Sequence, residues 1–116
     1  MKGEVENLKF IHKILEDKQD RLWIILENGK LYRADKKGKL TKQIPGAETL
    51  EAKDIRQDNK GNIYLATKND GIYLLKAGST IFTKIAGIGN LPIDNIYISR
   101  DQRLFIGCDG YGYLRV

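Results

Sequence analysis

The residues of this sequence that carry reactive side chains are few and far apart. There is one histidine, His12, and one cysteine, Cys108. A structural zinc site needs four such ligands, and a hydrolase triad needs a nucleophile, a base and a carboxylate that meet. With no second histidine and only Ser79 and Ser99 as serines, the sequence predicts neither arrangement. We therefore expect no catalytic residue, no bound metal and no cofactor, and we interpret Cys108 as a buried structural thiol.

Acidic turns are a second feature with potential chemistry. The stretch 58–62 (DNKGN) has the composition of a calcium loop, but a lysine interrupts it and no glutamate follows at the spacing of an EF-hand. Aspartate at the start of a turn accepts hydrogen bonds from its own backbone, and glycine supplies positive φ. We therefore interpret Asp17 and Asp58 as turn formers. The glycine-rich stretches 87–90 and 110–113 precede no expected helix, so we interpret them as strand connections rather than phosphate loops.

The elements that carry these residues recur along the chain. Residues 58–74 (DNKGNIYLATKNDGIYL) align without gaps with residues 17–33 and 99–115, each 41 positions away. Because turn residues and strand residues are preserved together, chance similarity does not explain the match. A period near 40 residues with strand-type content is typical of propeller blades. The expected strands are residues 11–16, 21–26, 30–34, 39–44, 52–57, 62–67, 71–76, 80–85, 94–99, 103–108 and 112–116.

The second strand of each unit is the most informative. Residues 22–26 and 63–66 are apolar at every position, whereas a sheet with one solvated face alternates apolar and polar residues. A strand that is buried on both faces belongs to a sheet with neighbours on both sides, as in stacked blades. We expect the rings of Trp23, Tyr64 and Phe105 to fill the contacts between blades. The predicted fold is all-β, with about three four-stranded antiparallel blades of an incomplete propeller.

The units divide the chain into blade 1 (residues 11–51), blade 2 (52–93) and blade 3 (94–116, without its outer strand), after a linker or partial strand at 1–10. A ring usually needs four to eight blades. An arc of three leaves two apolar faces open, so we expect self-association to cover them, a pair of arcs in a six-blade ring being one solution. In such an assembly Val5–Phe10 of a partner would supply the missing fourth strand of blade 3.

Composition excludes two classes of partner. The net charge is +5, but the basic residues are scattered singly or in pairs, without the cluster that nucleic-acid binding requires. No apolar run approaches the ~18 residues of a membrane helix, so we expect no membrane contact in this segment. The N-terminus lacks the apolar core of a signal peptide. We therefore expect either a cytosolic protein or a piece of a longer exported one.

The repeat resembles the two-component regulator propeller repeat, whose pattern runs I-x-x-I-x-E-D-x-x-G-x-L-W-I-G-T-x-x-G-G-L-Y-R. The matching residues are Ile11, Ile14, Glu16-Asp17, Leu22-Trp23-Ile24 and Leu31-Tyr32-Arg33 in the first unit, Ile55, Asp58, Gly61, Ile63-Tyr64-Leu65, Thr67 and Gly71-Ile72-Tyr73 in the second, and Leu104-Phe105-Ile106-Gly107 and Gly112-Tyr113-Leu114 in the third. The tryptophan is kept only in the first unit, and Ile25-Leu26 replace the Gly-Thr there.

The resemblance implies a periplasmic, membrane-anchored sensor of a hybrid two-component histidine kinase that responds to glycan fragments. It implies binding without catalysis, and it assigns no ligand residue. From their place on inner strands and rim loops, we expect an oligosaccharide to meet Asp94, Asn95, Tyr97, Tyr111 and His12. The alternatives are a scaffold or protein-interaction propeller and a propeller glycosidase or lyase. The sequence lacks the S-x-D-x-G-x-T-W boxes of sialidases and the signatures of WD40 blades.

Overall fold

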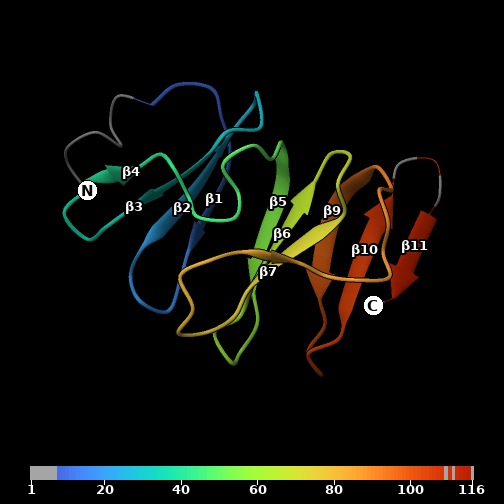
Figure 1. Ribbon diagram of the computed structural model, residues 1–116. Coiled ribbons are helices and arrows are strands. Elements are labelled where there is room, and N and C mark those ends of the chain that lie inside the picture. The colour runs from blue at the N-terminus through green and yellow to red at the C-terminus, as the bar shows by residue number, and fades with distance from the viewer. Residues whose placement is uncertain (1–7, 109, 111, 116) are drawn as a thin grey trace.

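The computed structural model describes residues 8–108, 110 and 112–115, which form eleven strands in three antiparallel sheets arranged side by side (Figure 1). Sheet 1 contains β1 (Ile11–Glu16), β2 (Leu22–Leu26), β3 (Leu31–Ala34) and β4 (Leu40–Thr41). Sheet 2 contains β5 (Ala52–Gln57), β6 (Ile63–Thr67), β7 (Ile72–Leu75) and β8 (Thr83–Lys84). Sheet 3 contains β9 (Ile93–Ile98), β10 (Leu104–Cys108) and β11 (Gly112–Arg115).

Within each sheet the strands follow one another in chain order, so every connection is a short hairpin. The all-β fold of propeller-type blades is thereby confirmed, as an arc that does not close. Within the described part of the chain, no helix has the length and apolar composition that crossing a membrane requires. The sheets meet most closely through their first strands, since β5 lies against both β1 and β9.

The fourth strands are shorter than expected. The sequence pattern predicts six residues in each, whereas β4 and β8 have two residues each. The chain leaves the ladder early after β4 because Ile44 and Ala47 turn inward and are buried between sheets 1 and 2. Burial of these apolar side chains replaces the hydrogen bonds that a longer edge strand would make.

Two separate apolar cores hold the sheets together. The first joins sheets 1 and 2 through Trp23, Ile25, Leu31, Ile44, Ala47, Ala52, Ile55, Ile63, Leu65, Leu75 and Phe82. The second joins sheets 2 and 3 through Ala66, Ile72, Ile93, Ile96, Leu104, Ile106 and Cys108. Each core lies between two sheets rather than within one, so no single sheet buries its apolar residues without a neighbour.

Candidate functional site

The inner strands β1, β5 and β9 each contain a bulge at the same place. The pairing with the second strand skips His12 in sheet 1, Lys53 in sheet 2 and Asp94 in sheet 3. A bulge leaves one residue outside the ladder and re-aims its side chain. The bulges therefore set one polar residue of each inner strand near the N-terminal end of that strand, along one rim of the arc. We call these three residues the bulge row. The Nε2 atom of His12 lies 3.1 Å from the carbonyl oxygen of Lys53.

A buried carboxylate joins the inner strands next to this row. Asp54 is almost fully buried, and its Oδ2 atom accepts a hydrogen bond from the backbone N–H of Ile96 at 2.9 Å, while Oδ1 accepts one from its own neighbour Ile55 at 2.8 Å. The ammonium group of Lys13 lies 2.9 Å from Oδ1. A buried carboxylate is tolerated only when it is paired in this way. Asp54 therefore fixes how the three inner strands, and with them the bulge row, lie relative to one another.

Asp94 and Asn95 border an open hollow of about 410 Å³ at the end of sheet 3. The other residues that line it are Gly107, Cys108, Gly110, Gly112 and Tyr113. The side chain of Asn95 occupies the space where a Cβ atom of residue 107 would stand. Glycine at this position therefore makes room for Asn95.

The residues expected to bind ligand do not all meet. Asp94 and Asn95 lie together, whereas Tyr97, on the same face of sheet 3 as Asn95, lines a second hollow of about 350 Å³ with Phe105 and Tyr113. Tyr113 borders both hollows. His12 belongs to the same bulge row as Asp94 but lies on β1, with β5 between the two strands. Tyr111 lies outside the described residues.

The three aromatic residues of the second strands have different surroundings. Trp23 is fully buried between sheets 1 and 2, where its ring meets that of Phe82 edge to face at 5.7 Å. Tyr64 is partly buried against the core between sheets 2 and 3. Phe105 is also partly buried, but it lies on the outer face of sheet 3, on which no other sheet of the described chain packs.

The turn aspartates make more contacts than their turn role requires. Asp17 is buried, and it accepts hydrogen bonds from the backbone of Gln19 and Arg21, from Arg21 Nε at 2.8 Å and from the indole N–H of Trp23 at 2.8 Å. Burial raises the pKa of Asp17, but these hydrogen bonds outweigh it and hold the pKa below its ordinary value. The carboxylate therefore stays ionised and anchors the buried ring.

The same link weakens from the first repeat to the third. In sheet 2, the hydroxyl of Tyr64 lies 3.4 Å from Asp58 Oδ2, and burial followed by the charge of Asp58 raises the pKa of this tyrosine. In sheet 3 the two positions are Ser99 and Phe105, and a phenyl ring has no donor. The sequence contains this signal. In the first two units an acidic residue at the turn is followed six residues later by a side chain with an N–H or O–H donor, whereas in the third unit a serine is followed by a phenylalanine.

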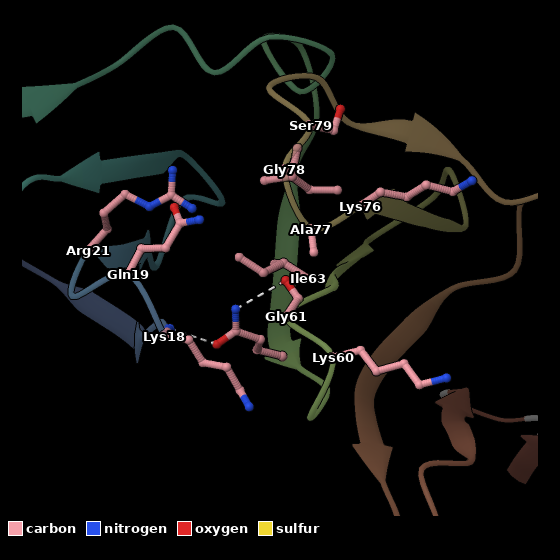
Figure 2. Close-up of a pocket in the computed structure, with 12 residues that line it drawn as sticks. Lys18, Gln19, Arg21, Lys60, Gly61, Ile63, Lys76, Ala77, Gly78 and Ser79 are labelled. Atoms are coloured by element: carbon pink, nitrogen blue, oxygen red, sulfur yellow. Dashed lines mark hydrogen bonds between the residues drawn. The ribbon is translucent and has the colours of Figure 1, made fainter.

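Another pocket, of about 230 Å³, lies between sheets 1 and 2 at the opposite end of the strands from the bulge row (Figure 2). Its lining includes Lys18, Arg21, Lys60 and Lys76, which are scattered in the sequence. Figure 2 shows the ammonium groups of Lys60 and Lys76 pointing away from it, and Arg21 is paired with Asp17 at 2.8 Å. Because the cationic groups do not converge, we interpret the pocket as a polar gap between sheets 1 and 2 rather than as an anion-binding site. Among the described residues, no three metal-binding side chains lie together.

The sequence matches no protein-family model. It also matches no curated protein. Solved structures do resemble its fold. One is a streptogramin B lyase, with a TM-score of 0.67 and 20% identity over 91% of this chain and 37% of the lyase.

Two further similar structures are of the extracellular domain of BT4673 from B. thetaiotaomicron. The one described as a putative hybrid two component system has a TM-score of 0.68 and 23% identity over 89% of this chain and 14% of the other. The one described as a putative one component system has a TM-score of 0.64 and 16% identity over 100% of this chain and 16% of the other.

The chain thus spans between about one seventh and about two fifths of the length of these similar structures. At such identities the similarity shows the fold alone, and this fold is shared by a lyase and by a sensor domain. What the comparisons establish, together with the three stacked sheets, is that the chain has the fold of part of a β-propeller.

Proposed function

We propose that this chain is a ligand-binding part of a sensor propeller of a two-component system, and that it has no catalytic activity of its own. The ligand is a glycan fragment, bound along the bulge row of His12, Lys53 and Asp94 with Asn95 beside it. The observation that carries the proposal is this row, because three bulges at equivalent places set three different polar groups along one rim of the arc.

The chemistry of the row suits a ligand rich in hydroxyl groups. Asp94 and the side-chain carbonyl of Asn95 accept hydrogen bonds, whereas Lys53 and the amide group of Asn95 donate them. The hollow beside Asp94 and Asn95 is lined by glycines, so backbone groups are also within reach of a ligand. The rigid junction at Asp54 supports this reading, since binding sites work best on elements whose geometry is already set.

The similarity to the extracellular domain of a putative hybrid two component system supports the sensor part of the proposal. An extracellular sensor domain lies outside the cytoplasm, so we propose a periplasmic location for this chain as part of a membrane-anchored protein. The resemblance of the repeat to two-component regulator propellers points the same way. The glycan class rests on that resemblance and on the polar character of the row.

Thermal unfolding in the presence of short neutral and acidic oligosaccharides tests the proposal. A ligand at about 100 times its Kd stabilises the folded state by about 2.7 kcal/mol. In a domain of this size, that raises Tm by roughly 10 °C. If no oligosaccharide raises Tm, the glycan class is wrong.

The site within the chain is tested by a pair of matched variants. Asp94→Asn removes the charge from the bulge row, and we expect it to reduce the ligand-induced rise in Tm at least by half. Asp20→Asn makes the same change in an exposed turn at the far end of β1, and we expect it to leave the rise unchanged. Equal responses of the two variants would place the ligand elsewhere.

The lyase similarity supports a second candidate, a propeller enzyme. It differs in its predicted readout, since a lyase converts its substrate whereas a sensor releases the ligand unchanged. Chromatography of each stabilising oligosaccharide after prolonged incubation separates the two. A scaffold propeller, the third alternative, predicts no stabilisation by any small molecule.

A further inference from the structure

The two ends of the arc present opposite faces of the same repeat. We call the face of each sheet that carries Trp23, Tyr64 or Phe105 its forward face, and the face that carries Ile14, Ile55 or Ile96 its back face. The forward face of sheet 1 packs on the back face of sheet 2, and the forward face of sheet 2 packs on the back face of sheet 3. The molecule thus forms the same kind of interface twice. One half of that interface is left uncovered on sheet 1, and the other half is left uncovered on sheet 3.

The forward face of sheet 3 is the open half at one end. Leu31 and Ile72 occupy equivalent forward positions and are buried, whereas Tyr113 at the third such position is 77% exposed. Tyr97, on the same face, is 56% exposed, and the two tyrosines line an apolar hollow with Phe105. Three aromatic residues around one open hollow form a larger apolar patch than scattered surface residues do.

The back face of sheet 1 is the open half at the other end. Ile55 and Ile96 are buried inside the two interfaces, whereas the equivalent Ile14 is 49% exposed. Ile11, on the same strand, and Phe10 beside it are also exposed. An apolar strand face is therefore available at this end, and it belongs to the repeat that packs against forward faces elsewhere in the molecule.

A polar contact between sheets 1 and 2 indicates which residues of the two open ends would face each other. Gln57, on the back face of sheet 2, accepts a hydrogen bond from the backbone N–H of Lys18 at 2.9 Å. The residue equivalent to Gln57 in sheet 1 is Glu16, and the residue equivalent to Lys18 in sheet 3 is Arg100. Both are exposed. The two ends thus carry opposite charges at the positions that pair in the interface between sheets 1 and 2.

We propose that a second copy of this chain docks its sheet 1 on the sheet 3 of the first, head to tail, through the interface that the molecule repeats internally. Tyr97, Phe105 and Tyr113 pack on Ile14 of the second copy, and Arg100 pairs with its Glu16. Such a contact is heterologous, so it yields a ring when the rotation closes and an open chain when it does not.

Head-to-tail docking also extends the bulge row. His12 touches the neighbouring inner strand at Lys53. The same step across the new interface sets His12 of the second copy beside Asp94 of the first. Docking would also cover Asn95 and Tyr113, which line the hollow beside Asp94, so association is measured without any saccharide.

Sedimentation velocity across a wide range of protein concentration is the first test. We expect association of the full chain to rise with concentration, and we expect both Tyr113→Glu and Ile14→Glu to abolish it. Both positions are exposed, so the variants should keep the circular dichroism spectrum of the parent. Ile81→Glu, at another half-exposed isoleucine away from both end faces, is the matched control and should leave association intact.

Mixing the two defective variants tests the head-to-tail arrangement itself. Ile14→Glu keeps a working sheet 3, and Tyr113→Glu keeps a working sheet 1, so each is monomeric alone but an equimolar mixture forms a dimer and nothing larger. A symmetric interface through sheet 3 would instead leave Ile14→Glu fully associated by itself. That result would overturn the proposal, and so would a parent chain that stays folded and monomeric at every concentration.

Charge reversal tests the register. Glu16→Arg and Arg100→Glu should each weaken association by roughly fivefold, and the chain that carries both should recover it. Failure of the double variant to recover, with both single variants weakened, would show that these two residues do not face each other and would overturn the proposed register.

Discussion

The junction of sheets 1 and 2 and the outer face of sheet 3 use the same backbone positions for opposite purposes. At the junction, Trp23 is fully buried and its ring meets Phe82 at 5.7 Å. On the outer face the equivalent Phe105 borders an open hollow. The strands themselves pair in the same way in both sheets. The difference teaches that hydrogen bonding makes each sheet, while burial of the second strand depends on whether a neighbouring sheet is present.

Truncation of the two rings gives the largest expected contrast. Trp23→Ala removes a buried ring from a closed junction and should lower the free energy of unfolding by about 3–5 kcal/mol. Phe105→Ala removes a ring whose other side faces solvent, so we expect a loss of about 1 kcal/mol. Urea denaturation of both variants in dilute protein measures the difference. Similar losses at the two positions would show that sheet 3 has a covered outer face even in the monomer.

A pair of glycines gives the next contrast, because their backbones are nearly alike and their surroundings are not. Gly46 and Gly87 both have positive φ, at 82° and 88°. A Cβ atom at Gly46 would collide with the backbone carbonyl of Phe82, whereas one at Gly87 would meet nothing within 4 Å.

Alanine at either position therefore costs about 1–2 kcal/mol for its backbone conformation. Gly46→Ala should cost a further ~1–3 kcal/mol for overpacking. Equal thermal shifts in the two variants would mean that the junction between sheets 1 and 2 is not tightly closed at Phe82.

Acid unfolding should also distinguish the two regions. The pKa of Asp17 is lower in the folded chain than its ordinary value of 3.8, because its hydrogen bonds outweigh the effect of burial. The stabilisation is therefore fully present above the unfolded-state pKa and is lost as the pH falls through the folded-state pKa.

Asp17→Asn places an amide N–H₂ group where other hydrogen-bond donors already converge. We therefore expect the free energy of unfolding to fall by about 2 kcal/mol at neutral pH. The same variant should show a shallower loss of stability on acidification below about pH 4. Ser79→Ala, which removes a hydroxyl whose hydrogen bonds are to the backbone of Ile81, is the control and should leave the acid dependence unchanged. An unchanged slope in Asp17→Asn would mean that this carboxylate does not control acid stability.

The sequence contained enough to predict the architecture. The period of 41 residues and the doubly apolar stretches 22–26 and 63–66 are local signals, because strand pairing within a hairpin follows directly from residue order. The early end of β4 was not predictable in the same way, since it depends on the burial of Ile44 and Ala47 between sheets 1 and 2.

The candidate site was harder to predict than the fold. Asp94 and Asn95 were expected to meet a ligand because of their place on an inner strand and at the rim, and they do lie together. Their relation to Lys53 and His12 comes from three bulges, and a bulge is visible only when the pairing is known. Tyr97 follows Asn95 by two residues and lies on the same face of sheet 3, but it is further along β9, so it lines the hollow of Phe105 and Tyr113 rather than the hollow beside Asp94.

The link between the turn and the ring provides the finest test of the comparison. In sheet 1, Asp17 accepts the indole N–H of Trp23 at 2.8 Å, whereas Ser99 and Phe105 hold the same positions in sheet 3 without such a bond. Ser99→Asp with Phe105→Trp rebuilds the first arrangement in the third sheet.

If the repeats share their local geometry, the double variant should be about 1 kcal/mol more stable than the sum of the single changes predicts, and urea denaturation of all four proteins gives this coupling. The coupling should be smaller than that of Asp17 with Trp23, because solvent reaches the outer face of sheet 3 and weakens a charged hydrogen bond. A coupling as large as that in sheet 1 would mean that the turn and the ring form a self-sufficient unit. The position of the ring would then be set by the turn, and the packing of a neighbouring sheet on the ring would follow from it.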